Sequence, residues 1–114
     1  MVKIYHNPLC GTSRTTLKML EEHGLEPEVI EYLKTPPSRN ELIRLINDAG
    51  LTVREAMRSK EAIYQDLQLD NPALGDGDLI DAMIAHPILI NRPFVVTDKG
   101  TRLCRPATEL NNIL

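Results

Sequence analysis

The sequence predicts an α/β fold: a mixed four-stranded sheet shared by a β-α-β half and a β-β-α half, with a helical insertion between the two halves. The first two extended runs flank one helical pattern, which favours parallel pairing with a right-handed crossover. Capping signals mark a helical block in the middle of the chain. Near the C-terminus the turn signal DKG (98–100) joins two apolar runs as an antiparallel hairpin.

The β-α-β half occupies residues 2–33. VKIYH (2–6) alternates as a strand does, and the helical pattern over 11–23 ends at Gly24, which suits the left-handed position after a helix. EVIEYL (28–33), rich in β-branched and aromatic residues, predicts the second strand.

The middle of the chain predicts helices only. Pro36 and Pro37 end the second extended run, and Ser38 forms a capping box with Glu41 that starts a helix ending before Gly50. Thr52 and Glu55 repeat the capping box and predict a short helix there. Two further helices are expected at 60–67 and from 76 or 78 to 85.

The last half is expected to be extended at ILI (88–90), FVVT (94–97) and TRLC (101–104), and Pro106 favours the first turn of a final short helix. This order of elements is the thioredoxin-like plan with extra helices inserted in its middle. The chain has no repeats, low-complexity tracts or obvious linkers, which predicts a single domain over residues 1–114.

Composition and charge exclude several classes of function. The 114 residues include 13 basic and 16 acidic ones, for a net charge of −3, and show no clustered basic face of the kind that nucleic-acid binding needs. No apolar run approaches the ~20 residues of a membrane span, and the N-terminus MVKIYHN lacks the apolar core of a signal peptide. We therefore expect a cytoplasmic protein, and a monomer because no exposed apolar stripe is identifiable.

The two cysteines, Cys10 and Cys104, are the first candidates for chemistry. In a reducing cytosol an unpaired thiol is more often buried, catalytic or metal-binding than part of a structural disulfide. The histidines are scattered, and neither cysteine belongs to a C-x-x-C pair. We therefore expect no metal site and no tightly bound cofactor.

The loop YHNPLCGTSR (5–14) places Cys10 between the first strand and the first helix. Backbone N–H groups and the helix dipole at such a position stabilise a thiolate and lower its pKa. The same N–H groups can hold an oxyanion. Thr12 and Ser13 add hydroxyl donors, and Gly11 lets a ligand approach the backbone closely.

Alternatives stay open at two residues of this loop. Cys10 could be a chance thiol in a turn, and His6 could either support the thiolate or serve only as a surface or structural residue. Ser13 makes the motif C-x-x-S, which cannot form the disulfide of a dithiol thioredoxin. Thr16 excludes the C-x5-R loop of low-molecular-weight tyrosine phosphatases.

Arginines that bind an oxyanion must therefore come from elsewhere in the chain. The candidates are Arg58 between two short helices, Arg92 directly before Pro93, and Arg105 after the last strand. A planar guanidinium makes two parallel charge-assisted bonds to a tetrahedral oxyanion, and proximity to the strands favours Arg92 and Arg105. Pro93 occupies the place of the cis-proline of thioredoxin-like folds, so we expect a cis bond although only ~5–6% of X–Pro bonds are cis.

Four segments in order, YHNPLCGTSR, PPSRNEL, HPILINRPFVV and GTRLCRP, resemble the glutaredoxin-dependent arsenate reductases over residues 3–107. The best-known members continue into a longer C-terminal segment, whereas this chain ends at Leu114. The resemblance implies reduction of arsenate to arsenite, with glutathione as co-substrate and glutaredoxin as partner. Cys10 would form a thioester to arsenic, glutathione would attack this adduct, and glutaredoxin would recycle the cysteine while arsenite leaves.

The resemblance also implies roles for the other residues. Oxyanion binding would fall to Arg58, Arg92 and Arg105, support of the thiolate to His6 and Ser13, and the cis bond to Pro93. The chemistry agrees, because guanidinium groups and helix N–H donors would remove the repulsion between a thiolate and arsenate. A lone C-x-x-S cysteine also explains why an external thiol is needed.

Other interpretations are a resolving thiol at Cys104 and two different functions. A buried strand residue is favoured for Cys104, since free cysteine is among the most buried residue types.

One other function is a non-enzymatic regulator of the same fold that binds a partner such as RNA polymerase. Ser13 argues against this function, because those relatives commonly carry C-x-x-C as a redox switch. The other is a glutathione-dependent reductase of a different small oxidised species.

Overall fold

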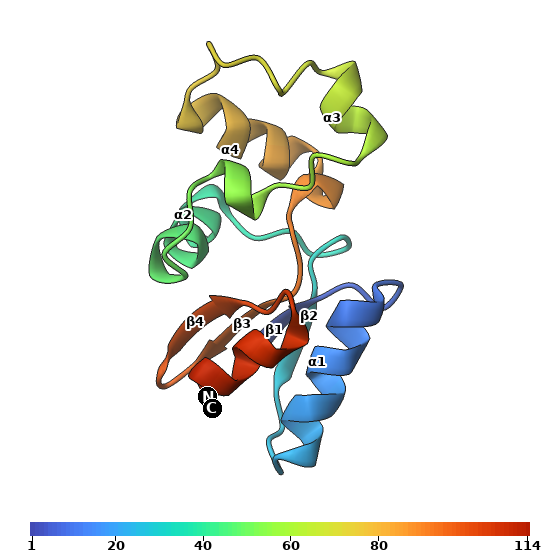
Figure 1. Ribbon diagram of the computed structural model, residues 1–114, viewed down its shortest axis with the longest axis vertical. Coiled ribbons are helices and arrows are strands. Elements are labelled where there is room, and N and C mark those ends of the chain that lie inside the picture. The colour runs from blue at the N-terminus through green and yellow to red at the C-terminus, as the bar shows by residue number, and fades with distance from the viewer. The chain divides into compact units, whose positions relative to one another are not determined.

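The computed structural model describes residues 1–114 and contains two compact units. The first unit combines Met1–Thr35 with Arg92–Leu114, and the second is Pro36–Asn91. Strands occur only in the first unit, whereas the second is built from short helices and their connections (Figure 1).

One four-stranded sheet organises the first unit, in the order β2-β1-β3-β4. Its strands are β1 (Lys3–His6), β2 (Glu28–Glu31), β3 (Phe94–Thr97) and β4 (Gly100–Leu103). β1 pairs with β2 in parallel and with β3 antiparallel, and β3 pairs antiparallel with β4. This confirms the predicted mixed sheet, its parallel β-α-β half and its C-terminal hairpin.

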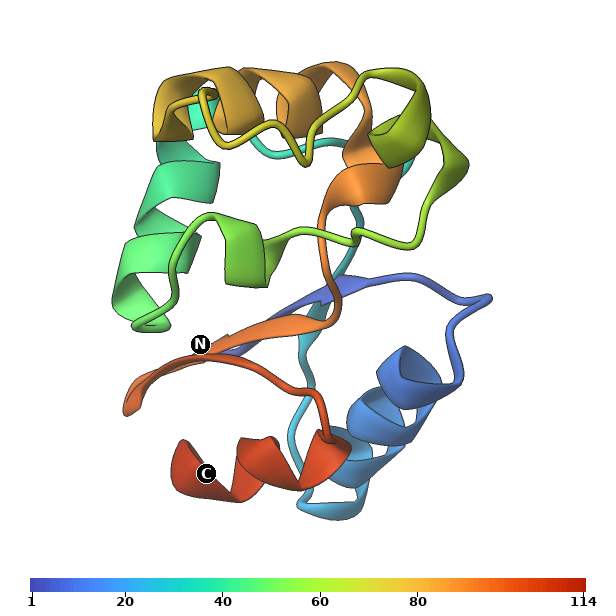
Figure 2. The same cartoon turned by 45° about the horizontal axis from the view of Figure 1, so that its top comes forward.

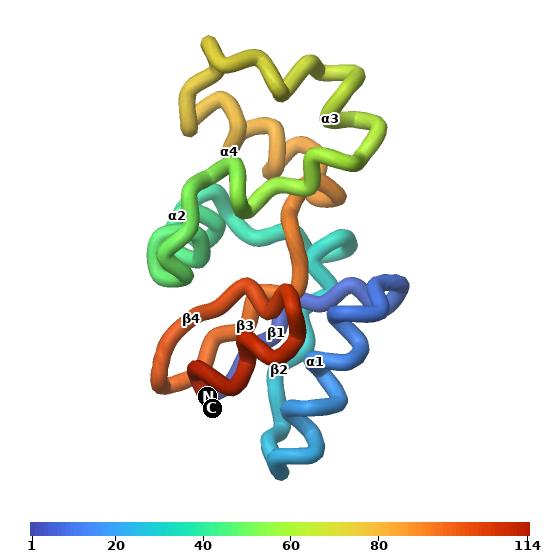
Figure 3. Tube along the Cα trace, viewed as in Figure 1, coloured from blue at the N-terminus to red at the C-terminus, as the bar shows by residue number.

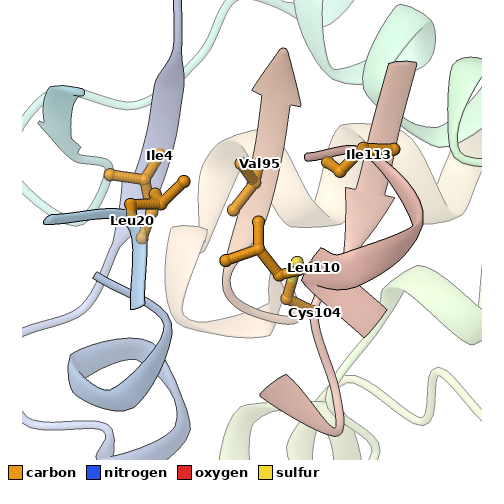
Figure 4. Packing of buried hydrophobic residues seen from close by; sticks show 6 residues of the cluster. All are labelled: Ile4, Leu20, Val95, Cys104, Leu110 and Ile113. Atoms are coloured by element: carbon orange, nitrogen blue, oxygen red, sulfur yellow. The ribbon is translucent and has the colours of Figure 1, made fainter. Parts of the chain in front are cut away.

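Helix α1 (Gly11–Glu22) and the 3-10 helix η3 (Ala107–Asn112) cover the same face of the sheet, as Figure 2 shows. They enclose an aliphatic core with the two central strands, which Figure 4 shows from close by. Its buried members are Ile4, Leu20, Val95, Cys104, Leu110 and Ile113. Burial of these side chains from strands and helices at both ends of the sequence is what holds the first unit together.

The ends of the predicted elements are mostly confirmed in the first unit. Gly24 has φ +75° and ends α1 as expected. The second strand was predicted to reach residue 33 but ends at Glu31, because the N–H groups of Lys34 and Thr35 both donate to the Glu31 carbonyl at 2.9 Å. That turn removes the last two residues of EVIEYL from the sheet ladder.

The second unit contains α2 (Arg39–Asp48), η1 (Arg54–Ala56), α3 (Ala62–Asp66), α4 (Asp76–Ala85) and η2 (Pro87–Leu89). α2 and α4 contact each other, as the tube in Figure 3 also shows. Both predicted capping boxes are present. At α2 the Glu41 N–H donates to Ser38 Oγ at 3.1 Å and the Ser38 N–H donates to Glu41 Oε1 at 3.3 Å. Thr52 and Glu55 make the same reciprocal bonds before η1.

The prediction that residues 88–90 are extended is wrong for most of the segment. Pro87–Leu89 is a 3-10 turn, in which the Ile90 N–H donates to the Pro87 carbonyl at 2.9 Å. Only Ile90 makes a single bridge, to Met57. A run of three apolar residues cannot distinguish a strand from a buried turn, and Pro87 pre-sets the backbone angle that starts the turn.

Two peptide bonds that precede proline residues in the first unit are cis. The Arg92–Pro93 bond is cis, which confirms the prediction, and the Arg105–Pro106 bond is also cis. The final helix after Pro106 is of the 3-10 type. None of the helices combines the length and the apolar character that a membrane crossing would require.

The capping box of α2 can be tested by Ser38→Ala. This change leaves the Glu41 N–H without its side-chain acceptor, so we expect the free energy of unfolding to fall by about 1 kcal/mol. Urea denaturation followed by circular dichroism measures the difference. Ser59→Ala, at another exposed serine, is the matched control and should stay within about 0.5 kcal/mol of wild type. Equal losses in both variants would contradict the role of the cap.

Candidate active site

Cys10 is the N-cap residue of α1, with extended backbone angles of φ −94° and ψ 122°. The loop before it is held by its own hydrogen bonds. The Cys10 N–H donates to the Asn7 carbonyl at 3.0 Å, and the Leu9 N–H donates to Asn7 Oδ1 at 3.0 Å. Cys10 is only 8% exposed, whereas Leu9 is exposed in solvent. The thiol is therefore held in a buried position at the start of the helix, next to an exposed loop residue.

The sheet register brings two of the three candidate arginines to this loop. Arg92 precedes β3 and Arg105 follows β4, and both ends of the hairpin lie at the edge of the sheet where β1 ends. Arg105 Nη1 lies 3.6 Å from the Cys10 sulfur and 3.2 Å from the Arg92 carbonyl oxygen, to which it also donates. The Arg92 carbonyl therefore orients the Arg105 guanidinium toward the thiol.

Opposing effects set the pKa of Cys10. Burial disfavours the thiolate and raises the pKa. Hydrogen bonds from the Arg92 guanidinium, the Ser13 N–H and the Arg105 guanidinium, together with the positive charge of Arg92, outweigh burial and lower the pKa from 9.0 to about 7. A thiol with this pKa is substantially ionised at neutral pH, which is the form that reacts as a nucleophile.

His6 and Ser13 form a buried pair behind the thiol. His6 Nδ1 lies 2.6 Å from Ser13 Oγ, which also accepts the Asn7 N–H at 3.1 Å. Ser13 thus acts on Cys10 through its backbone N–H, while its hydroxyl is used by His6 and Asn7. Burial lowers the pKa of His6 below 6.5; Glu31 opposes this shift, and Arg14 adds to it.

Gly11 and Thr12 occupy the first turn of α1 directly after the thiol. A Cβ atom added at Gly11 would meet only Arg14 Nη2, at 3.8 Å. Space beside the backbone therefore does not by itself require glycine at this position. The Thr12 carbonyl accepts the Thr16 hydroxyl at 2.8 Å, which is an ordinary bond within the helix.

Arg58 lies in the second unit, and the site described here is built from the first unit alone. Its Nε donates to Glu61 Oε1 at 3.1 Å, and its backbone N–H donates to the Leu89 carbonyl at 2.8 Å. The guanidinium is thus partly buried and held by a carboxylate of the next helical segment.

Arg14 is a charged residue of the loop that the sequence analysis missed. Its Nη1 donates to the Pro8 carbonyl at 2.9 Å, and its N–H donates to the Cys10 carbonyl at 3.0 Å. The signal was its position four residues after Cys10, which places both residues on one side of the first helical turn. Arg14 ties the tip of the loop to the helix.

Cys104 differs from Cys10 in every respect that matters for reactivity. It is fully buried in the core, and both cysteines are free thiols. Burial and the charge of Glu109 raise the pKa of Cys104 to about 12, against the opposing charge of Arg102. The interpretation of Cys104 as a buried residue is confirmed. The described chain brings together no group of three His, Cys, Asp or Glu side chains that could hold a metal ion.

Comparisons with known proteins agree with this geometry. The model of the ArsC family matches residues 5–113. An arsenate reductase of Rhizobium meliloti (strain 1021) is 58% identical over 99% of this chain and 81% of its own length. One from Escherichia coli (strain K12) is 53% identical over 99% of this chain and 80% of its own length.

A solved arsenate reductase from Vibrio cholerae has the same fold. It superposes with a TM-score of 0.95 at 48% identity, and the match covers 99% of this chain and 97% of that one. The resemblance that the sequence motifs indicate therefore extends over the whole fold and includes the Cys10 loop. The chain belongs to the ArsC family.

Proposed function

We propose that this protein reduces arsenate to arsenite, with the Cys10 thiolate as the nucleophile. The observation that carries the proposal is the position of the Cys10 sulfur, 3.6 Å from Arg105 Nη1, with Arg92 and the Ser13 N–H among the groups that lower the pKa of the thiol. These cationic and N–H groups favour a thiolate and can also bind an anionic substrate. The arsenate reductases that the chain resembles support arsenate as that substrate.

In the first step the Cys10 sulfur attacks the arsenic atom. A sulfur–arsenic bond forms, one oxygen leaves as hydroxide and is protonated to water, and the arsenic stays pentavalent. Arg92 and Arg105 reduce the repulsion between the thiolate and the oxyanion and stabilise the charge that develops on oxygen. The N–H groups of Gly11 and Thr12 lie at the first turn of α1, where they can donate to the same oxygens.

Reduction of the adduct needs two electrons, which two thiols supply when they become one disulfide. Cys104 is fully buried and its pKa is raised to about 12, so a second thiol of this chain is a poor donor. We therefore assign the electrons to external thiols. Glutathione attacks the arsenic of the adduct and displaces a second oxygen as water. A glutaredoxin thiolate then attacks the glutathione sulfur to form a mixed disulfide, and the electron pair of the broken arsenic–glutathione bond makes arsenic trivalent. Water finally replaces the Cys10 sulfur on arsenic, which releases arsenite and the Cys10 thiolate.

The resemblance supports Arg58 as a third oxyanion-binding arginine and His6 and Ser13 as residues that support the thiolate. It also supports the cytoplasm as the site of the reaction, since free thiols and glutathione persist there. The monomeric state stays a prediction.

The central test compares arsenite release by wild type, Cys10→Ser and Cys104→Ala. We expect Cys10→Ser to fall to background and Cys104→Ala to stay active, because only the first removes the proposed nucleophile. Each protein is assayed with glutathione alone, glutaredoxin alone and both, and the highest rate should require both. Turnover by folded Cys10→Ser would reject the mechanism, and turnover with either thiol alone would revise the reductant.

The ionisation of Cys10 is tested by its rate of alkylation with iodoacetamide as a function of pH. The rate should reach half its maximum near pH 7, because the thiolate is the reacting form. In Arg92→Gln a cation that favours the thiolate is lost, so the midpoint should move upward toward 9.0. Arg102→Gln removes an equal charge that acts on Cys104 and is the control. Similar midpoints in wild type and Arg92→Gln would contradict the assigned cause.

Oxyanion binding is tested by the KM for arsenate in Arg105→Ala. A hydrogen bond to a charged group contributes about 1.5–3 kcal/mol, so we expect KM to rise by a factor of about 10 to 150. The assay is run near pH 9, where more of Cys10 is ionised in both proteins and the effect on the thiol pKa is reduced. Arg102→Ala, on β4 three residues before Arg105, should leave KM unchanged. An unchanged KM in Arg105→Ala would exclude Arg105 from arsenate binding.

A further inference from the structure

His6 is linked to the nucleophile through one intermediate residue. It ends β1, is 6% exposed, and places Nδ1 at 2.6 Å from Ser13 Oγ. Ser13 is fully buried, and its N–H is one of the groups that lower the pKa of the Cys10 thiol. A change in the tautomer or charge of the imidazole would therefore first alter the hydrogen bond to Ser13 and, through Ser13, the surroundings of the thiol.

The hydrogen bonds of Ser13 are compatible with one particular tautomer of neutral His6. Ser13 Oγ already accepts the Asn7 N–H at 3.1 Å and has one hydroxyl hydrogen to donate. In the arrangement that uses this hydrogen, neutral His6 accepts it at Nδ1 and carries its own proton on Nε2. The Nε2–H of this tautomer points away from Ser13, and because His6 is only 6% exposed, a neighbouring carboxylate would be a stronger acceptor for it than bulk water.

Glu31 is placed to be that acceptor. It is the residue directly opposite His6 in the parallel register of β1 and β2, so both side chains lie on the same face of the sheet. Its carboxylate is 43% exposed and pairs with Lys34 at 3.6 Å, an ion pair weak enough in water to leave it available.

The other charges around His6 are few. Arg14 from α1 opposes the imidazolium, and Glu31 favours it. β3, the other neighbour of β1, has the sequence FVVT and brings no charge. Glu31 is also absent from the groups that act directly on Cys10, which are Arg92, Arg105 and the Ser13 N–H.

We propose that Glu31 is a positioning residue of the active site: its carboxylate accepts the Nε2 proton of His6 and so holds Nδ1 toward the Ser13 hydroxyl. This line from Glu31 through His6 to Ser13 orients the first turn of α1, from which the Ser13 N–H acts on the Cys10 thiol. The inference concerns Cys10 as a thiol and uses no property of arsenate. Its failure and the failure of the proposed function can therefore be told apart.

The two ways in which Glu31 could influence Cys10 have opposite signs. Acting directly through space, the negative charge would disfavour the thiolate, so its removal would speed alkylation of Cys10. Acting through His6 and Ser13, it supports the thiolate, so its removal would slow alkylation. The direction of the change therefore separates a positioning role from a simple charge effect.

The experiment compares wild type with Glu31→Ala, Glu31→Gln and Glu28→Ala. Glu28→Ala removes the same charge from the same strand, but Glu28 lies opposite Lys3 and on the other face of the sheet. Nitrogen NMR of the His6 ring reports its tautomer and its pKa, and backbone amide signals of β1 and β2 report that the sheet is intact. Iodoacetamide alkylation at pH 7 reports Cys10.

We expect the His6 ring of wild type to carry its proton on Nε2. Glu31→Ala should mix the tautomers and slow alkylation of Cys10 by a factor of about 2 to 10, the equivalent of one ordinary hydrogen bond. Glu31→Gln keeps an acceptor oxygen, so it should retain the tautomer and lower only the pKa of His6. Glu28→Ala should change neither readout, and in a His6→Ala background Glu31→Ala should no longer slow alkylation.

Three results would overturn the proposal. The first is a wild-type His6 that carries its proton on Nδ1. The second is a set of His6 signals that Glu31→Ala leaves unchanged. The third is faster alkylation in Glu31→Ala, which would assign Glu31 a direct charge effect in place of a positioning role.

Discussion

In the sheet of the first unit, Phe94 of β3 pairs with Tyr5 of β1 on one side and with Leu103 of β4 on the other. Because β3 is antiparallel to both neighbours, the end of β1, the start of β3 and the end of β4 meet at one edge. This register brings the Cys10 loop close to Arg92 and Arg105, which flank the β3–β4 hairpin, although they lie far from Cys10 in the sequence. A slip of one residue would turn the side chains of a strand to the opposite face, so the aliphatic core and the active site depend on the same pairing.

The two cysteines show how strongly local surroundings decide thiol chemistry within one small unit. Both are nearly inaccessible, and burial disfavours the thiolate of both. At Cys10, N–H and guanidinium donors more than offset burial, whereas at Cys104 the carboxylate of Glu109 adds to it. One thiol is thus ionised near neutral pH while the other stays protonated. The difference comes from the complete burial of Cys104 and from the neighbouring groups, which are cationic and N–H donors at Cys10 and include a carboxylate at Cys104.

Much of this site could be predicted from the sequence, because its residues adjoin signals that sequence displays. Cys10 lies between a strand and a helix pattern, and Arg92 and Arg105 lie beside strand ends and prolines. The hydrogen-bond partners could not be predicted. Ser13 was expected to help through its hydroxyl, but its N–H is the group that lowers the pKa of Cys10, and the hydroxyl bonds His6. Side-chain direction at a helix start depends on three-dimensional contacts. This also explains why the hydrogen bond from Arg14 to the Pro8 carbonyl was missed.

A pKa of about 7 at Cys10 is better suited to the proposed chemistry than a much lower one would be. More donors around the sulfur would ionise the thiol further, but the nucleophilicity of a thiolate falls as its pKa falls, so the best attacking thiol has a pKa near the ambient pH. The sulfur must also leave arsenic at the end of the cycle, which a moderately stabilised thiolate does readily. Burial of Cys10 opposes the lowering of its pKa by Arg92 and Arg105, and the resulting pKa of about 7 is compatible with a thiol that is both ionised and nucleophilic.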